Sequence, residues 1–164
     1  MNYADIRDQI KTGDLIGFTH KGWLGWYNFK VQMVRMFTRS EYSHVAIAYV
    51  MNDRVFILEA VGAEVRLFPL SRELPFYWLN NPKKATQEAI DYGFSVLGLK
   101  YESQLMMALS FVFGFSLKHN KRVQCSELAN NWFKANGQEL TTSDTPTAVM
   151  QAALSKWPSM QFVE

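Results

Sequence analysis

The chain has 164 residues, of which 48% are hydrophobic, 15% aromatic and 20% charged. This length is typical of one domain, and the apolar content is sufficient for a sizeable core, which excludes intrinsic disorder. The formal net charge of +2 argues against nucleic-acid binding as the main function, so we expect no nucleic-acid partner. We therefore expect residues 1–164 to form a single domain.

The cysteine and histidine content limits the chemistry further. Cys125 is the one cysteine, which excludes an internal disulfide framework and a Cys-rich zinc site. The spacing of His20, His44 and His119 matches no metal-binding motif. We therefore expect neither a metal nor another cofactor.

The N-terminal residues, MNYADIRDQI, are polar. They contain no apolar h-region, so we expect no secretory signal and a protein that is cytoplasmic as synthesised. The longest apolar stretch, residues 105–115, is well short of the roughly 20 residues that a membrane-spanning helix needs. We expect no transmembrane segment, and we interpret this stretch as a buried helix or as a surface that meets lipid or a protein partner.

The first 40 residues combine a polar lead-in, a strand and an amphipathic segment. Ile6 and Ile10 are four residues apart, so they share one helical face. A Thr-Gly-Asp turn then leads into a predicted strand over 15–18. Residues 26–37 carry aromatic and Met side chains at helical spacing, within a region that contains basic but no acidic residues. This segment is either a core-packed helix with a solvated basic face or one wall of a groove for an anionic or glycan-like ligand.

The strongest β pattern lies in the middle of the first half. Two apolar runs, residues 43–50 and 54–61, are separated by Asn52-Asp53, which predicts a hairpin with a short turn. Residues 64–70 predict a third strand that ends, or lies at an edge, near Pro69. With the strand over 15–18, we expect an antiparallel sheet of four or more strands.

The second half of the chain is helical. The predicted helices cover residues 82–97, 103–117 and 123–135, followed by a last helix that begins at Thr145. Gly98 ends the first of them, and Asn136-Gly137 is typical of a helix C-terminus. Thr145 is suited to the N-cap and Pro146 to the first turn. Strands followed by helices predict an α+β fold.

Two polar residues lie in strands that are otherwise mainly apolar. His44 begins the strand over 43–50, and Glu59 lies within the apolar run Val-Phe-Ile-Leu-Glu-Ala. A carboxylate there needs a partner, because burying an unpaired charge is costly. With the turn at Asn52-Asp53, cross-strand partners have residue numbers that sum to about 105, so Glu59 is a diagonal neighbour of His44 on one face. This arrangement predicts a base and the carboxylate that orients it.

Cys125 lies near the start of a predicted helix. Free N–H groups and the helix dipole favour a thiolate there, and a nearby imidazole would lower the pKa of the thiol further. A nucleophile, a base and an orienting group would then be present together. Two other interpretations remain: a lone Cys is often a small buried hydrophobe, and Glu59 could pair with Arg54 or Arg66 across the hairpin.

Six short motifs occur in a particular order along the chain. They are Gly13-Asp14-Leu15-Ile16, Tyr42-Ser43-His44-Val45-Ala46-Ile47, Ile57-Leu58-Glu59-Ala60, Gly98-Leu99-Lys100-Tyr101, Gln124-Cys125-Ser126-Glu127-Leu128 and Thr145-Pro146. In these motifs the chain resembles the NlpC-like cysteine peptidases and amidases of papain-like fold. The order matches their circularly permuted, YaeF/YiiX-like branch, in which the Cys helix follows the strands instead of preceding them. The motifs extend over nearly the whole chain.

The resemblance implies a half-barrel of antiparallel strands that faces a helix presenting Cys125. In that family a thiolate attacks an amide or ester carbonyl and forms an acyl-enzyme that water resolves. Cys125 would be the nucleophile, His44 the general base and then acid, and Glu59 the group that holds the imidazole. The oxyanion would be met by the backbone N–H of Cys125 and one further donor, and His20 and Tyr101 are candidates for that donor or for a substrate contact.

The resemblance leaves three functions open. The first is an amidase or endopeptidase acting on bacterial cell-wall (peptidoglycan) peptides, which a phage particle or a specialised secretion system would deliver to the cell envelope. The second uses the same triad on acyl, thioester or lipid-acyl substrates, with the apolar segment 105–117 binding the acyl chain. The third is a non-catalytic structural module of a larger assembly, because a fold does not by itself determine a function.

Overall fold

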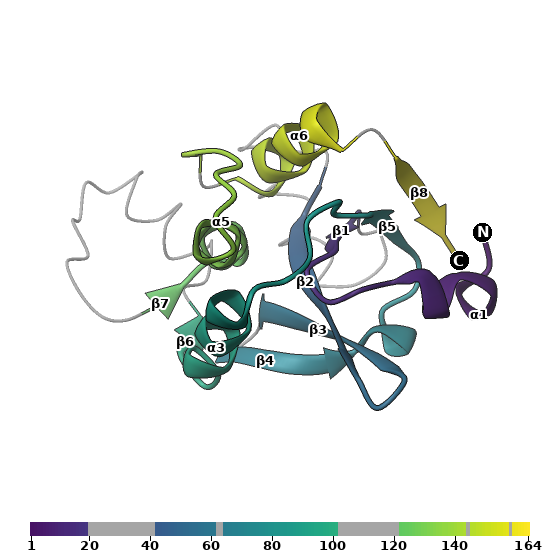
Figure 1. Cartoon of the computed structure of the whole chain (residues 1–164), viewed down its shortest axis with the longest axis horizontal. Helices are drawn as coiled ribbons and strands as arrows, with labels where there is room; N and C mark the ends of the chain where they lie inside the picture. Colours follow the sequence, from purple (N-terminus) through teal and green to yellow (C-terminus); the bar gives the residue numbers. More distant parts are fainter. Residues whose placement is uncertain (20–41, 62–63, 102–121, 144, 158) are drawn as a thin grey trace, which may run out of the picture.

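The computed structural model describes the chain except residues 20–41, 62–63, 102–121, 144 and 158 (Figure 1). The described part is an α+β domain in which an antiparallel sheet packs against helices, as the order of the elements predicted. The strands are β1 (Leu15–Phe18), β2 (His44–Met51), β3 (Arg54–Val61), β4 (Glu64–Pro69), β5 (Phe76–Leu79), β6 (Lys100–Tyr101), β7 (Arg122–Val123) and β8 (Met160–Val163). The α-helices are α1 (Tyr3–Ile6), α3 (Gln87–Ser95), α5 (Cys125–Ala135) and α6 (Pro146–Lys156), and 3-10 turns cover Arg7–Gln9 and Leu70–Arg72.

The strands form one sheet in the order β7-β6-β4-β3-β2-β1-β5-β8. All neighbouring pairs are antiparallel except the short parallel pair of β6 and β7. The central hairpin has the predicted register, since Ile47 lies opposite Leu58. Asn52 and Asp53 have φ angles of 49° and 56°, the positive values that a tight two-residue hairpin turn requires. This register decides which polar side chains of β2 and β3 share a face.

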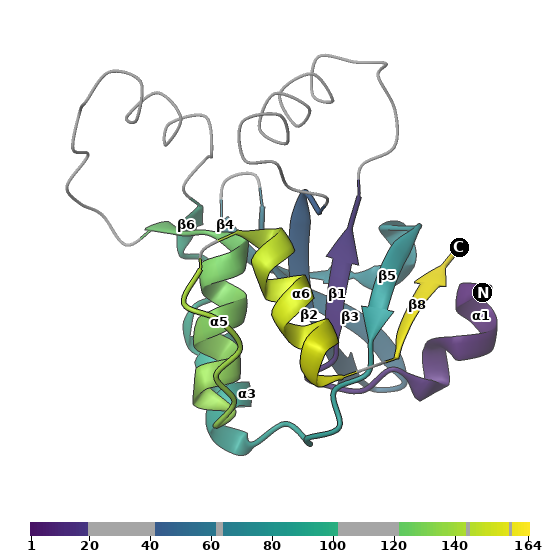
Figure 2. The same ribbon diagram turned by 90° about the horizontal axis from the view of Figure 1, so that it is seen from above.

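Two layers of buried side chains lie on opposite faces of the sheet. On one face, α3, α5 and α6 pack against the strands, and Leu128, Trp132 and Phe133 of α5 are fully buried. Figure 2 shows α5 and α6 running alongside β1 and β2. On the other face, Ile6 and Ile10 from the N-terminal lead-in pack with alternate residues of the strands. Both side chains are buried on one side, as predicted, but they do not share a continuous helical face, because α1 ends at Ile6 and Ile10 follows a 3-10 turn in an extended conformation.

Helix boundaries differ from the predicted ones at two N-termini. The first predicted helix begins at Gln87 instead of residue 82, because the Thr86 side chain caps the Ala89 N–H and residues 82–85 precede that cap. The Cys helix begins at Cys125 instead of residue 123, because Val123 belongs to β7. The last helix begins as predicted, with Thr145 as N-cap.

Four strands escaped prediction: β5, β8 and the two-residue strands β6 and β7. β5 and β8 are four residues each, too short for a clear alternation of apolar and polar residues. They pair with one another at the end of the sheet beyond β1. The termini complete this edge, since the N-terminal ammonium donates to the Phe162 carbonyl and Tyr3 N–H donates to the Glu164 carbonyl. The two ends of the chain accordingly lie side by side (Figures 1 and 2).

Two predicted segments lie outside the described residues. They are the amphipathic segment 26–37 and the whole apolar segment 103–117. Within the described ranges, every helix is too short or too polar to cross a bilayer.

Candidate functional site

His44 is the first residue of β2 and lies opposite Phe18, the last residue of β1. The Phe18 ring stacks on the imidazole, with ring centroids 5.6 Å apart and an angle of 27° between the planes. The His44 side chain is 12% exposed, so it is held between strands yet reaches the surface of the fold. The Phe18 ring at the end of β1 therefore restricts rotation of the His44 imidazole.

Glu59 lies within β3, and its side chain is only 3% exposed. Its Oε2 atom lies 2.9 Å from His44 Nε2. Its Oε1 atom accepts from Arg66 Nε at 2.8 Å and lies 2.7 Å from Arg66 Nη2. Arg66 is the direct cross-strand partner of Glu59 in the β3–β4 pair. Of the partners considered from the sequence, the carboxylate therefore holds His44 and Arg66, one on each oxygen, and not Arg54.

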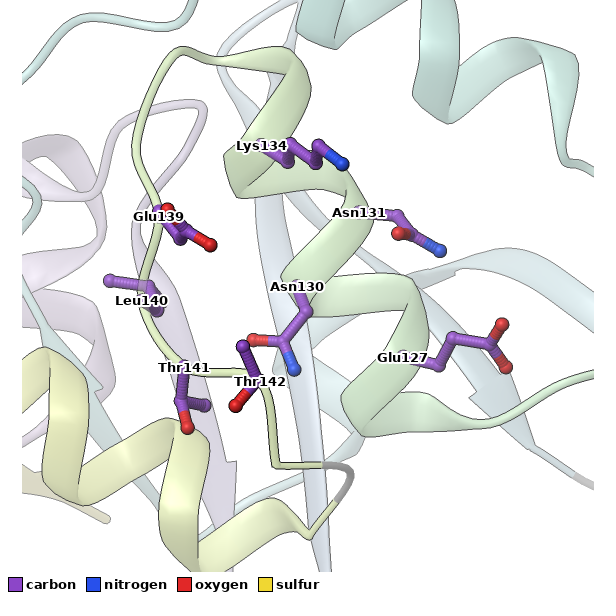
Figure 3. Close-up of a pocket in the computed structure, with 8 residues that line it drawn as sticks. All are labelled: Glu127, Asn130, Asn131, Lys134, Glu139, Leu140, Thr141 and Thr142. Atoms are coloured by element: carbon purple, nitrogen blue, oxygen red, sulfur yellow. The ribbon is translucent and has the colours of Figure 1, made fainter.

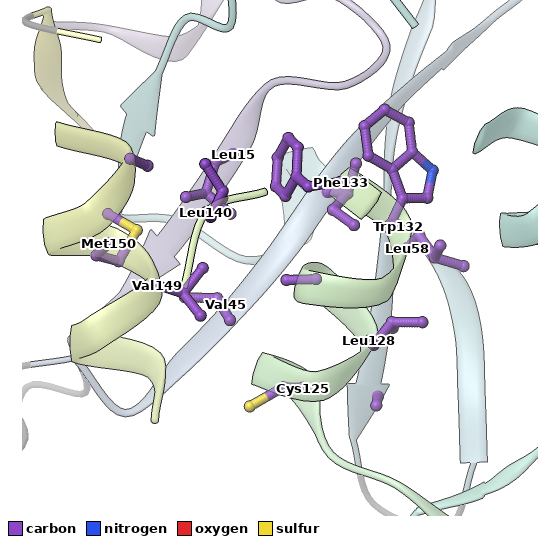
Figure 4. Packing of buried hydrophobic residues seen from close by; sticks show 14 of the residues in the cluster. Leu15, Val45, Leu58, Cys125, Leu128, Trp132, Phe133, Leu140, Val149 and Met150 are labelled. Carbon is purple, nitrogen blue, oxygen red and sulfur yellow. The ribbon is translucent and has the colours of Figure 1, made fainter. Parts of the chain in front are cut away.

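Cys125 is the first residue of α5 and is 1% exposed. Figure 4 shows its sulfur at the first turn of the helix, beyond the packed side chains of Leu128, Phe133 and Trp132. The thiol interacts with the His44 side chain, and this interaction lowers the pKa of Cys125 and raises that of His44. Because His44 Nε2 bonds Glu59, the nitrogen that faces the thiol is Nδ1. The structure thus brings together all three residues, from the starts of β2 and α5 and from the middle of β3.

The electrostatics of the pair favour a thiolate and an imidazolium. Burial alone would raise the pKa of the Cys125 thiol, but the hydrogen bond and charge of His44, with backbone N–H groups of Val45 and Ser126, lower it. Burial likewise acts to lower the pKa of His44, yet hydrogen bonds to Cys125 and Glu59 raise it to about 10. Each ion stabilises the other in a buried site.

The carboxylate of the site is held in its charged form. Burial acts to raise the pKa of Glu59, but the hydrogen bonds and positive charges of His44 and Arg66 outweigh it and lower the pKa. An ionised Glu59 can only accept hydrogen bonds, so it requires a proton on His44 Nε2. This leaves Nδ1 as the nitrogen that exchanges a proton with Cys125.

The Gly-Asp motif secures the strand next to His44. Asp14 is 1% exposed and accepts hydrogen bonds from the backbone of Lys11 and Asn81 and from Trp78 Nε1, at 2.9, 2.9 and 2.7 Å. These bonds tie the start of β1 to the end of β5. These hydrogen bonds give the Asp of the Gly-Asp motif a structural role, because a buried carboxylate needs hydrogen-bond donors.

The far end of α5 is tied to the same region. Asn81 and Gln138 exchange side-chain hydrogen bonds, and Asn81 Nδ2 also donates to the Gly13 carbonyl. The Lys83 ammonium donates to the Asn136 carbonyl at the helix C-terminus, where a cation is favourable. Along the helix, Trp132 Nε1 donates to the Tyr49 hydroxyl of β2 at 2.8 Å. These contacts fix the helix that carries Cys125 relative to the strand that carries His44.

The two remaining predicted site residues, His20 and Tyr101, are not tested by the described residues. His20 lies outside the described residues. Tyr101 belongs to β6 and pairs through the backbone with Val123 of β7, while its side chain lies outside the described part. Arg66 and Phe18, in contrast, contact the site directly. Arg66 had a signal in the sequence, because it was one of the expected cross-strand partners of Glu59, whereas the stacking of Phe18 on His44 had none.

A small polar pocket lies elsewhere on α5, and it holds none of the predicted site residues. Figure 3 shows the helix side chains and the following loop that line it: Glu127, Asn130, Asn131, Lys134, Glu139, Leu140, Thr141 and Thr142. Glu127 is two residues after Cys125, about 200° around the helix axis. This pocket therefore faces away from the thiol. Among the residues that the structure describes, no three His, Cys, Asp or Glu side chains group together as metal ligands.

Comparison with known proteins supports the architecture. No family model and no curated protein sequence matches the chain. It is similar to the crystal structure of the metalloprotein YiiX from Escherichia coli O157:H7, with a TM-score of 0.61 over 95% of this chain and 97% of that chain. The chain has a YiiX-like fold. At 18% sequence identity the likeness shows the fold alone, in agreement with the fold expected from the motif order.

Proposed function

We propose that the protein is a cysteine hydrolase in which Cys125, His44 and Glu59 act together through an acyl-enzyme. The observation that supports this proposal is the hydrogen bond between His44 and the buried Glu59 carboxylate, together with the interaction of the Cys125 thiol with the same imidazole. A nucleophile, a base on one side of it and an orienting carboxylate behind the base are the parts that this chemistry needs.

In the first half of the reaction, the Cys125 thiolate attacks the carbonyl carbon of the substrate. A C–S bond forms, and the carbonyl π electrons move to oxygen. The backbone N–H of Cys125 is available to this oxyanion, because the first N–H groups of a helix have no partner within the helix. The oxyanion then collapses, the C–N or C–O bond breaks, and His44 Nδ1 gives its proton to the leaving group.

In the second half, a water molecule replaces the leaving group. His44, now neutral, takes a proton from the water molecule while the water oxygen attacks the thioester carbon. The C–S bond breaks, the carboxylic acid leaves, and the thiolate and imidazolium are restored. Glu59 keeps the proton on Nε2 throughout, so that Nδ1 is the nitrogen that loses and regains a proton.

For the substrate, we propose an amide bond in bacterial cell-wall peptides. The proposal is supported by the resemblance of six motifs to those of the NlpC-like peptidases and amidases. Two of these motifs, Gln124-Cys125-Ser126 and Tyr42-Ser43-His44, lie at the starts of α5 and β2 in this chain. YiiX is by its name a metalloprotein. In this chain the Glu59 carboxylate is bonded to the Arg66 guanidinium, so its charge is already neutralised by a cation, and no step of the proposed reaction uses a metal.

The test is the release of new amines from purified cell-wall sacculi. The wild type and a Ser155→Ala control, which alters an exposed side chain of α6, should release amines, and Cys125→Ala should release none. Hydrolysis of short-chain nitrophenyl esters or thioesters without action on sacculi would contradict the peptide substrate and support acyl chemistry on the same triad. A wild type that is inactive on both classes and has an ordinary thiol would support the non-catalytic alternative.

A further inference from the structure

A fourth side chain is joined to the three proposed catalytic groups. Arg66 lies across from Glu59 on β4, and its Nε and Nη2 atoms lie 2.8 and 2.7 Å from Glu59 Oε1. We propose that Arg66 is a positioning residue, which holds Glu59 with its other oxygen facing His44 and sets the pH range in which the Cys125 thiolate exists. This inference rests on the proposed function in that it requires the ion pair of Cys125 and His44.

The two oxygens of Glu59 have separate partners. Oε1 accepts a hydrogen bond from Arg66 Nε and forms an ion pair with Nη2, and Oε2 lies against His44. Exchange of the two oxygens would break this charge-assisted hydrogen bond and the ion pair, and such a bond is stronger than a neutral one. Because the Glu59 side chain is 3% exposed, bulk water cannot replace them easily. Arg66 therefore fixes the direction from which the carboxylate meets the imidazole.

Arg66 is itself held from two further sides. Its guanidinium carbon lies 4.1 Å from the ring centroid of Phe68, two residues further along β4 and hence on the same face. Glu73 Oε1 lies 3.9 Å from Arg66 Nη2. The Arg66 side chain is 39% exposed, so the guanidinium stands between the buried carboxylate and solvent.

The charges of these groups alternate along the chain of contacts. With the ion pair formed, Cys125 and Glu59 are anions, while His44 and Arg66 are cations, and Glu73 adds a more exposed anion outside them. Loss of the guanidinium leaves the buried groups with one negative charge in excess. Removing a cation raises the pKa of neighbouring acids, so both the Cys125 thiol and the Glu59 carboxyl would keep their protons to higher pH.

The test is the rate of Cys125 alkylation by iodoacetamide between about pH 4 and pH 9. Cys125 is the one cysteine of the chain, so all label reports on the site. Arg66→Gln should move the acid midpoint of the rate upward by about 0.5 to 1 pH unit, as expected for a charge at this range in a partly buried site. Arg66→Lys keeps the charge but loses the planar guanidinium, so its midpoint should lie between those of wild type and Arg66→Gln. Arg54→Gln, at an exposed position of β3, is the matched control and should not move it.

An Arg66→Gln midpoint that coincides with wild type, or an Arg66→Lys shift as large as that of Arg66→Gln, would overturn the inference. If Arg66→Gln does not fold by circular dichroism, Glu73→Gln replaces it. Removal of that anion should lower the acid midpoint by about 0.2 to 0.3 pH unit, and no change or a rise would count against the inference. A wild-type thiol without low-pH reactivity contradicts the proposed function instead, so the two failures are distinguishable.

Discussion

The carboxylate of Glu59 joins two residues from different strands, His44 of β2 and Arg66 of β4, through its two oxygens. A carboxylate in the middle strand of three can do this because its neighbours on both sides project toward the same face. The imidazole is thereby oriented from the side opposite the thiol. The proposed chemistry depends on this direction, since it leaves Nδ1 free to exchange a proton with Cys125.

The first prediction concerns the reactivity of the thiol. The pKa of Cys125 is lowered chiefly by His44, so the native thiolate should exist below the ordinary thiol pKa, and alkylation by iodoacetamide should remain fast there. In His44→Ala the imidazolium is absent and the thiol remains buried. The reaction should then need a pH near or above the ordinary thiol pKa of about 8.5, and the rate at pH 6 should fall more than about 10-fold.

Two controls accompany this measurement. Denatured wild type gives the intrinsic rate of the exposed thiol at each pH. His119→Ala tests whether loss of a different histidine has any effect on the rate. If His44→Ala and wild type share one pH profile, the ion pair of Cys125 and His44 does not exist in solution.

The second prediction concerns the charge of Glu59. His44 has a pKa raised to about 10 in part by this anion, so Glu59→Gln should lower the midpoint of the His44 titration by about 1 to 2 pH units. The sign follows because loss of an anion destabilises the imidazolium. The titration can be followed by imidazole NMR, with His44→Ala to assign the signal.

Glu64→Gln, an exposed carboxyl on β4, is the matched control for this change and should leave the His44 midpoint in place. A Glu59→Gln midpoint equal to that of wild type would show that the carboxylate does not act on His44 by charge. A rise in the midpoint would contradict the proposed arrangement of the three groups directly.

Much of the central sheet could be predicted because its signals are local. The Asn52-Asp53 turn sets the register of β2 against β3, and that register places Glu59 near His44. The short strands β5 and β8 lack such a signal, because their pairing with each other is a contact between distant parts of the chain. The start of α3 was predicted too early for a different reason. Several residues in that region are suitable N-caps, and Thr86 is the one that caps the helix.

The site was predictable to the extent that its residues stood out by type. A single Cys at a helix start and a carboxylate inside an apolar strand are unusual enough to be noticed. Their meeting depends on how α5 packs over β2, which no short motif encodes. The network of Asn81, Gln138 and Lys83 that fixes the end of α5 links polar residues of ordinary loops, so the sequence gives no reason to group them.

The third prediction concerns the buried aspartate of the Gly-Asp motif. Asp14→Ala should lower the free energy of unfolding by about 3 to 5 kcal/mol, because it leaves the N–H groups of Lys11, Trp78 and Asn81 without their acceptor. Asp14→Asn should recover only part of this loss, since its amide NH2 would face donors. Urea denaturation followed by Trp fluorescence measures both.

Asp8→Asn is the comparison for this pair of changes, because the Asp8 side chain is 80% exposed. Surface substitutions of this kind usually change the free energy of unfolding by less than about 0.5 kcal/mol. If Asp14→Asn proves as stable as wild type, the carboxylate is not the acceptor of all three N–H groups.

The last prediction concerns the contact between α3 and β2. Gly93 lies within α3, where alanine would ordinarily stabilise the helix by about 1 kcal/mol. A Cβ at this position would lie 2.8 Å from Cζ of Tyr49 and 3.1 Å from Cδ2 of Leu58, and the Tyr49 hydroxyl accepts from Trp132 of the Cys helix. Gly93→Ala should therefore lower the free energy of unfolding by about 2 to 3 kcal/mol through overpacking. Gly98→Ala, at φ 77° with no atoms within 4 Å, should cost only about 1 kcal/mol of backbone strain, and the reverse order of the two losses would refute the packing described for α3.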